Sequence, residues 1–83
     1  MNVVDIDELN LISAQEYFKL SFGDRLRAVR LSRGFTLDEL EKKSGLSRSV
    51  ISGYELNKNQ PGIFNLEVLC KSLDIGASAL LGF

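Results

Sequence analysis

The chain has 83 residues, of which 45% are apolar and 25% charged, so one small soluble domain with a single core is expected. It contains one cysteine and no histidine. An internal disulfide, a structural zinc site within one chain and a serine–histidine or cysteine–histidine nucleophile pair are therefore excluded. We expect no enzyme, no cofactor and no metal site. The net charge of −1 divides unevenly: residues 1–22 carry four acidic residues and one lysine, whereas residues 23–83 carry nine basic and seven acidic residues.

The first section of the chain, to about Leu20, is acidic and rich in apolar side chains. A short helix near residues 5–19 is predicted from its apolar spacing. We treat residues 1–21 as an N-terminal extension of a domain that spans residues 22–83. The apolar surface of residues 1–20 must be buried on its own domain, on a twin in a homodimer, or on a foreign protein such as a toxin. Its apolar residues include Val3, Val4, Ile6, Leu9, Leu11, Ile12, Tyr17 and Phe18.

The next helix is predicted from Phe22 to Arg33. Ser21 precedes Asp24 by three residues, a spacing typical of a helix N-cap, and Gly34 ends the segment. Leu26 and either Val29 or Arg30 face one way. Three arginines spread around the remaining surface, and we expect them to be solvated rather than in contact with a ligand: Arg25, Arg27 and Arg33.

Two short helices joined by a tight turn are then predicted between Thr36 and Glu55. Thr36 and Glu39 form a capping box, so the first of these helices begins at Leu37. Gly45 is typical of a helix C-terminus, and Ser47 suits the N-cap of the second helix. A glycine turn of about three residues between two amphipathic helices predicts a helix-turn-helix, whose second helix can lie in the DNA major groove.

The rest of the chain completes an all-α fold. A loop is predicted over residues 56–62, a helix from Ile63 to Ser72, and one or two further turns over residues 77–81. We expect Cys70 to be a buried small hydrophobe rather than a reactive thiol. The prediction is a compact five-helix domain with an N-terminal extension.

The sequence resembles the phage-repressor and Cro-like, or Xre-like, helix-turn-helix family from about Phe22 to Leu81. Each marker is weak alone, but their order and spacing together are specific. The markers are Gly23 to Arg27, Arg30, Arg33 to Thr36, Glu39, Leu40, Gly45 to Ser52, Tyr54, Glu55, Pro61, Leu66, Leu69, Cys70, Leu73, Ile75 and Leu80.

The resemblance implies a lambda-repressor-like domain of five helices that acts as a homodimer on a two-fold symmetric operator in double-stranded DNA. It also implies an ion pair between Arg30 and Glu55. Two positions depart from the family pattern. Leu37 stands where the family has a polar side chain, which leaves only a backbone N–H for a phosphate. Glu41 stands where the family favours alanine, so Glu41 must rotate to solvent or find a partner, and a tilted helix pair would be one result.

The residues expected to face the bases begin the second helix of the pair. Arg48 is the strongest candidate, because a guanidinium group can donate two hydrogen bonds to guanine O6 and N7. A phosphate contact and a solvated arginine are the alternatives. Glycine at position 53, inside a helix, indicates either close approach of the backbone to DNA or close helix packing. Val50 could contact a thymine methyl group or could be partly buried. The full candidate set is Arg48, Ser49, Val50, Ser52 and Gly53.

Contacts with phosphates are expected from the turn, the loop and the start of the first helix of the pair. Asn57 also suits a left-handed turn, which would account for it without DNA. The candidates are Leu37, Ser47, Asn57, Lys58 and Asn59.

Two functions remain open at this point. The first is a sequence-specific DNA-binding transcriptional regulator, and the resemblance favours a repressor. The second is a protein-interaction module or antitoxin that binds a partner through residues 1–20. The start of the chain lacks a signal-peptide layout, and no apolar run approaches the length of a membrane span, so a cytoplasmic protein of bacterial or phage origin is expected.

Overall fold

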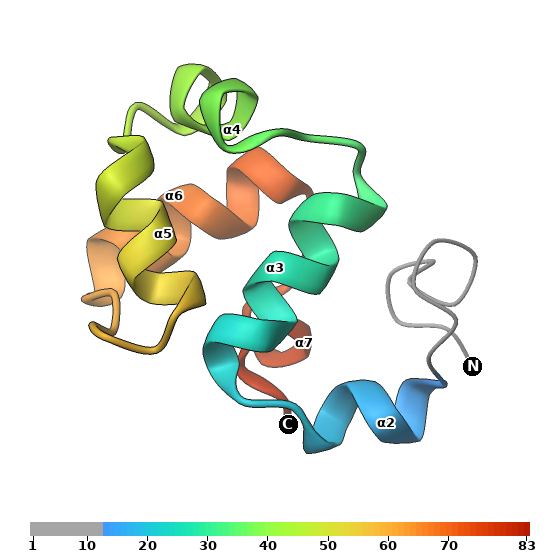
Figure 1. The fold of residues 1–83 in the computed structure, drawn as a ribbon. Coiled ribbons are helices and arrows are strands. Elements are labelled where there is room, and N and C mark those ends of the chain that lie inside the picture. Colours follow the sequence, from blue (N-terminus) through green and yellow to red (C-terminus); the bar gives the residue numbers. More distant parts are fainter. Residues whose placement is uncertain (1–12) are drawn as a thin grey trace.

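The computed structural model describes residues 13–83, and this part of the chain is helical without strands (Figure 1). The helices are α2 (Ala14–Lys19), α3 (Phe22–Ser32), α4 (Leu37–Ser44), α5 (Arg48–Glu55), α6 (Ile63–Leu73) and α7 (Ala77–Leu81). The five helices predicted between residues 22 and 83 are thus confirmed as α3 to α7. Among the described residues no helix is long and apolar enough to cross a membrane.

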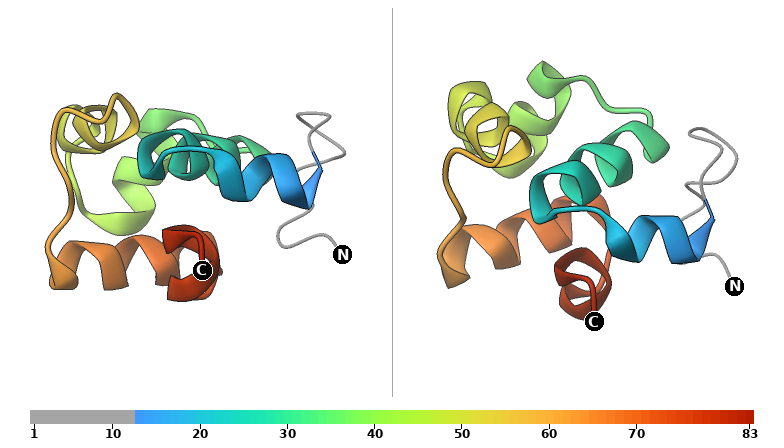
Figure 2. Two further views of the ribbon diagram at one scale, coloured as in Figure 1. Left: turned by 90° about the horizontal axis from the view of Figure 1, so that it is seen from below. Right: turned by 60° about the horizontal axis from the view of Figure 1, so that its bottom comes forward.

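Helix α3 is the central element of the fold. It packs against α5 and α7, while α4 contacts α5 and α6, and α6 contacts α7. Figure 2 shows α6 and α7 together on one side of α3 and α5. The core is formed by ten buried apolar side chains: Tyr17, Leu26, Ala28, Val29, Leu40, Ile51, Tyr54, Leu69, Leu73 and Leu80. Cys70 is partly buried against this core, and burial raises the pKa of its thiol, in keeping with its predicted role as a small hydrophobe.

The start of α2 corrects the helix predicted near residues 5–19. Ser13 has an extended backbone and forms a reciprocal capping box with Glu16, so α2 begins at Ala14 and no helix runs through Ser13. Tyr17 is 1% exposed, and its hydroxyl donates a hydrogen bond to the Ala79 carbonyl at 2.9 Å. This part of the extension packs on its own domain. The calls on Val3 to Ile12 lie outside the described residues.

Gly23 allows α3 to approach α5 closely. A Cβ atom at this position would lie 2.5 Å from the carbonyl oxygens of Tyr54 and Glu55, which no side chain tolerates without a shift of the backbone. The Gly23 N–H instead donates to Asn57 Oδ1 at 2.9 Å. The N-terminus of α3 therefore fixes the C-terminal end of α5 and the loop that follows it.

The predicted ion pair between Arg30 and Glu55 is present and buried. Arg30 Nε lies 2.7 Å from Glu55 Oε2, Nη2 lies 3.0 Å from Oε1, and the side chains are 8% and 7% exposed. Arg30 Nη1 also donates to the Phe35 carbonyl at 2.8 Å. Because each nitrogen of the guanidinium group and both oxygens of the carboxylate have a partner, the pair joins α3, α5 and the segment leading into α4 in one arrangement.

Two other arginines, one on α3 and one at its C-cap, correct the expectation that they are solvated. Arg25 is buried, and its guanidinium donates to the carbonyls of Leu80 at 2.9 Å, Leu81 at 2.8 Å and Leu20. Arg33 is half-buried and donates to the carbonyls of Leu73 and Asp74, at 2.7 and 3.0 Å. Both cations satisfy the C-terminal ends of helices α7 and α6, where the helix dipole is negative.

Candidate nucleic-acid interface

Local capping sets the geometry of α4 and α5 as the sequence predicts. Thr36 and Glu39 form a reciprocal capping box, and these hydrogen bonds lower the pKa of the Glu39 carboxyl. Gly45 ends α4 with φ +80°, a left-handed conformation that favours glycine. Ser47 then caps α5 by accepting a hydrogen bond from the Val50 N–H at 3.2 Å. The turn between the two helices comprises only residues 45–47.

The outer face of α5 is presented to solvent at its N-terminal end. Arg48, Ser49 and Val50 are exposed, whereas Ile51 and Tyr54 are buried in the core. Tyr54 is held further by its hydroxyl, which accepts a hydrogen bond from Asn65 at 2.9 Å. Three of the five residues predicted to contact bases are thus exposed, whereas Ser52 is half-buried and Gly53 is buried.

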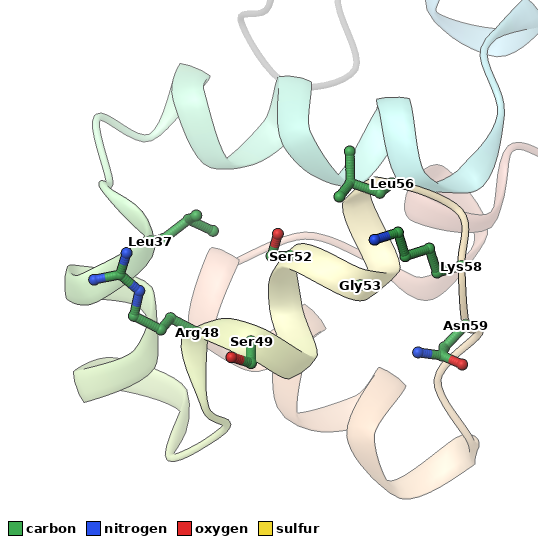
Figure 3. A pocket seen from close by; sticks show the side chains of 8 residues that line it. All are labelled: Leu37, Arg48, Ser49, Ser52, Gly53, Leu56, Lys58 and Asn59. Carbon is green, nitrogen blue, oxygen red and sulfur yellow. The ribbon is translucent and has the colours of Figure 1, made fainter.

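A shallow hollow of about 360 Å³ brings most of the candidate residues together (Figure 3). Arg48 and Leu37 lie at one end, Lys58 and Asn59 at the other, and the two serines of α5 lie between them. The charged residues of its lining, Arg48 and Lys58, are both cations. The lining is Leu37, Arg48, Ser49, Ser52, Gly53, Leu56, Lys58 and Asn59.

Arg48 has two partners on α4. Its Nη1 lies 2.9 Å from Asp38 Oδ1, in an ion pair with side chains 61% and 62% exposed. Its backbone N–H donates to Glu41 Oε2 at 3.2 Å. Glu41 thus finds a partner at the positive end of the α5 dipole, which resolves its departure from the family pattern.

Leu37 begins α4 with a half-buried side chain and a backbone N–H at the helix N-terminus. The side chain packs against the core. Neither the Leu37 N–H nor the Asp38 N–H donates a hydrogen bond to any group within residues 13–83. These two donors at the start of α4 are suited to a phosphate oxygen, as predicted for Leu37.

The loop after α5 divides between structural and exposed residues. Asn57 has φ +60°, and its side-chain amide bonds the Gly23 N–H and Ser21 Oγ, at 2.9 and 3.0 Å. This structural role accounts for Asn57, and its phosphate contact stays a prediction. The Gly53 carbonyl accepts from the N–H groups of Lys58 and Asn59, at 2.9 and 3.4 Å. A Cβ at Gly53 would lie 3.2 Å from Asn59 Nδ2. Contact with the loop is therefore a third explanation for glycine at this position, besides close approach to DNA and helix packing.

Three predicted residues do not line the hollow, and one residue that was not predicted does. Ser47, Val50 and Asn57 lie outside its lining. Leu56 belongs to the lining and is 61% exposed. It was not predicted, because nothing in the sequence distinguishes an apolar residue at the end of α5 as a surface residue of this site. Arg27 lines an adjoining hollow together with Arg48 and is exposed, in keeping with the expectation that it is solvated.

Comparison with known proteins places the chain in a family. The helix-turn-helix family HTH_3 matches residues 26–80, which include α4 and α5 with their connecting turn. The chain belongs to this helix-turn-helix family. Among the described residues no cluster of potential metal ligands accompanies the motif.

Two curated relatives illustrate the helix-turn-helix proteins that the chain resembles. The immunity repressor protein of Bacillus phage phi105 is 33% identical over 63 residues, which are 76% of this chain and 44% of the relative. The HTH-type transcriptional regulator SinR of Bacillus subtilis is 35% identical over 60 residues, which are 71% of this chain and 54% of the relative. The chain thus spans about half the length of the curated relatives it matches.

Two solved structures share the helix-turn-helix fold over nearly their whole length. The P22 c2 repressor protein, in complex with a synthetic operator, has a TM-score of 0.70 and 32% identity, with 75% of this chain and 94% of that chain covered. The restriction-modification controller protein C.AhdI from Aeromonas hydrophila has a TM-score of 0.69 and 33% identity, with 81% and 94% covered.

Proposed function

We propose that this chain is the DNA-binding part of a transcriptional repressor, with α5 as the recognition helix. The observation that carries the proposal is the convergence of predicted contact residues: seven of the ten line one hollow whose charged groups are Arg48 and Lys58. The P22 c2 repressor, crystallised with a synthetic operator, supports double-stranded DNA as the ligand. The repressors among the relatives support the direction of regulation.

The exposed end of α5 suits the DNA major groove, which is about 12 Å wide and admits one helix. In this placement Arg48, Ser49 and Ser52 face base edges. The N–H groups of Leu37 and Asp38 on one side, and Lys58 with Asn59 on the other, face the flanking phosphates. Ser47, Val50 and Asn57 border the same face from outside the hollow.

We further propose a homodimer on a two-fold symmetric operator. The region that carries the motif has a net charge of only +2, so one copy provides little nonspecific attraction to DNA. The domain extends 31 × 22 × 20 Å. Two such domains fit side by side on half-sites one helical turn, about 34–36 Å, apart. Such a protein acts where DNA lies, in the cytoplasm of a bacterium, and no catalysis is required of it.

A partner protein bound through residues 1–20 is the alternative function. Tyr17 is buried on its own domain and Leu20 packs against the core, so the hypothesis now depends on Phe18, which is 40% exposed, and on residues 1–12. Affinity capture with residues 1–12 deleted and Phe18 replaced by serine tests it and leaves Tyr17 in the core: a partner retained by this variant would contradict the alternative.

The experiment that tests the proposed function is selection of bound duplexes from a random pool with purified protein, followed by affinity measurements at several salt concentrations. We expect an enriched symmetric motif with half-sites one helical turn apart. We also expect affinity to fall with salt by about 0.9 log units per log unit for each phosphate contacted. Weak salt-sensitive binding with no enriched motif would contradict the proposal. The Arg48→Ala variant is tested alongside the wild-type protein. Because the exposed Arg48 side chain contributes little to the fold, a change in DNA binding by this variant reports on the contact with DNA rather than on unfolding.

A further inference from the structure

Two carboxylates of α4 hold Arg48 at both its backbone and its side chain. Asp38 Oδ1 bonds Nη1 at 2.9 Å, and Glu41 Oε2 accepts from the backbone N–H at 3.2 Å. Asp38 and Glu41 are three residues apart, so both lie on the face of α4 that is turned to the start of α5. Between them they fix the start of the Arg48 side chain and its charged end.

Stability does not explain the outer pair. Asp38 and Arg48 are about three-fifths exposed, and an ion pair in water contributes almost nothing to folding. A carboxylate at this position also opposes DNA binding, because it lies beside a hollow whose charged residues are otherwise cations. Asp38 also lies in the first turn of α4, where a carboxylate interacts favourably with the helix dipole, but that interaction requires no contact with Arg48. The consequence of the contact itself is therefore to be sought in what Arg48 does.

We propose that Asp38 is a positioning residue that restricts Arg48 to base reading, an inference that rests on the proposed function. A guanidinium group has five N–H donors in a planar fork. The bond from Nη1 to Asp38 leaves Nε and Nη2 for the O6 and N7 acceptors of a guanine.

The negative charge of Asp38 also disfavours an alternative pose in which Arg48 swings to a phosphate. Holding the side chain in advance removes conformational freedom that would otherwise be lost on binding. Asp38 thus increases the difference in affinity between right and wrong sequences, while it lowers affinity for DNA in general.

The test compares Asp38→Asn with the wild-type protein on the selected operator, its single-base variants and an unrelated duplex. Loss of discrimination in Arg48→Ala identifies the base pair that Arg48 reads. At that base pair we expect Asp38→Asn to reduce discrimination by about twofold to fivefold. This is the ratio of affinities that corresponds to the free energy of an exposed ion pair. Affinity for the unrelated duplex should rise, with a salt slope steeper by up to about 0.9 as Arg48 reaches a phosphate.

Two further variants separate positioning from charge. Glu67→Gln removes a carboxylate whose 61% exposure is close to the 62% of Asp38 but whose partner is Lys71 rather than Arg48, and it should leave discrimination unchanged. In an Arg48→Ala background, Asp38→Asn should have no further effect on discrimination, because Asp38 acts through Arg48.

The possible results have distinct meanings. A wild-type protein without sequence preference would overturn the proposed function, and the role of Asp38 with it. A wild-type protein that discriminates, with an Asp38→Asn variant that discriminates equally well, would overturn the positioning role alone. A variant that binds its operator more tightly at full discrimination would make Asp38 a competitor for Arg48, which also contradicts the inference.

Discussion

Two arginines of α3 and the arginine at its C-cap are used in the opposite way to the arginine of α5. Arg25, Arg30 and Arg33 direct their guanidinium groups to carbonyls and a carboxylate of the protein itself. Arg48 begins α5 on the outer surface and is held there by exposed partners. The number of basic residues in this chain therefore says little about its attraction to DNA, because three of its arginines hold the fold together. The variants below test this division, from the largest expected change in unfolding free energy to the smallest.

The largest effect is expected for Arg30→Met. The substitution leaves the Glu55 carboxylate buried without its partner, and removing one side of such a pair reduces the free energy of unfolding by about 3–5 kcal/mol. Urea unfolding measures it. The double variant Arg30→Met/Glu55→Leu is the control and should recover much of the loss, because no charge is stranded. Equal losses in both proteins would show that the charge is not what matters.

A smaller loss is expected for Arg25→Lys. Lysine keeps the charge but not the planar fork, so it cannot satisfy the carbonyls of Leu20, Leu80 and Leu81 together. We expect a loss of about 1–3 kcal/mol in urea unfolding, the range for a buried polar group left unpaired. Arg27→Lys on the exposed side of α3 is the matched control and should change stability by less than about 0.5 kcal/mol. Similar values for both would contradict the internal role of Arg25.

Tyr17→Phe should have a modest effect at neutral pH and a characteristic effect in alkali. The lost hydrogen bond to Ala79 is worth about 0.5–1.5 kcal/mol. Burial raises the pKa of Tyr17 from 10.0 to about 12. The unfolded chain therefore loses its phenolic proton first, so the wild-type protein loses stability as pH rises from 10 through 12.

This alkaline loss should be smaller in Tyr17→Phe than in the wild-type protein when thermal unfolding is followed between pH 9 and 12. Parallel pH profiles for the two proteins would contradict the burial of Tyr17 and, with it, the packing of α2 on the domain.

The smallest change in stability is expected for Arg48→Ala. Because the side chain is exposed, the free energy of unfolding should change by less than about 0.5 kcal/mol. Discrimination at one base pair should nevertheless fall by about 1–3 kcal/mol, as for a lost bidentate contact. Binding measured on the single-base variants of the operator tests this. A protein that kept full discrimination at every position would not use Arg48 to read a base.

Most of the helix boundaries could be predicted because their signals are local. The Thr36 and Glu39 capping box, the left-handed Gly45 and the Ser47 cap each involve residues three or four apart, and all are present. The start of α2 carries the same kind of signal in Ser13 and Glu16. The apolar spacing before Ser13 outweighed that signal, so one helix was predicted across an N-cap.

The roles of the arginines depend on residues far away in the sequence. The acceptors of Arg25 on α7 lie 55 and 56 residues away, and the Leu73 acceptor of Arg33 lies 40 residues away. Nothing next to these arginines distinguishes them from solvated ones. Arg30 could be assigned only because the resemblance to a family supplied Glu55 as its partner.

The candidate site was predicted well where one helix face decides it and less well where two elements meet. The outward position of Arg48, Ser49 and Ser52 follows from the helical period once Ser47 caps α5. The contacts of Arg48 with Asp38 and Glu41 depend instead on the angle between α4 and α5, which the turn sets in three dimensions.

The most direct test of the account is a titration of ¹⁵N-labelled protein with the selected duplex, followed by amide chemical shifts. We predict the largest changes at the amides of Leu37, Arg48 to Gly53, Lys58 and Asn59, with the Nε–H signals of Arg25 and Arg33 unaffected. Changes concentrated on α6 and α7, or spread evenly over the domain, would contradict the assignment of α4, α5 and their loop as the DNA-binding face.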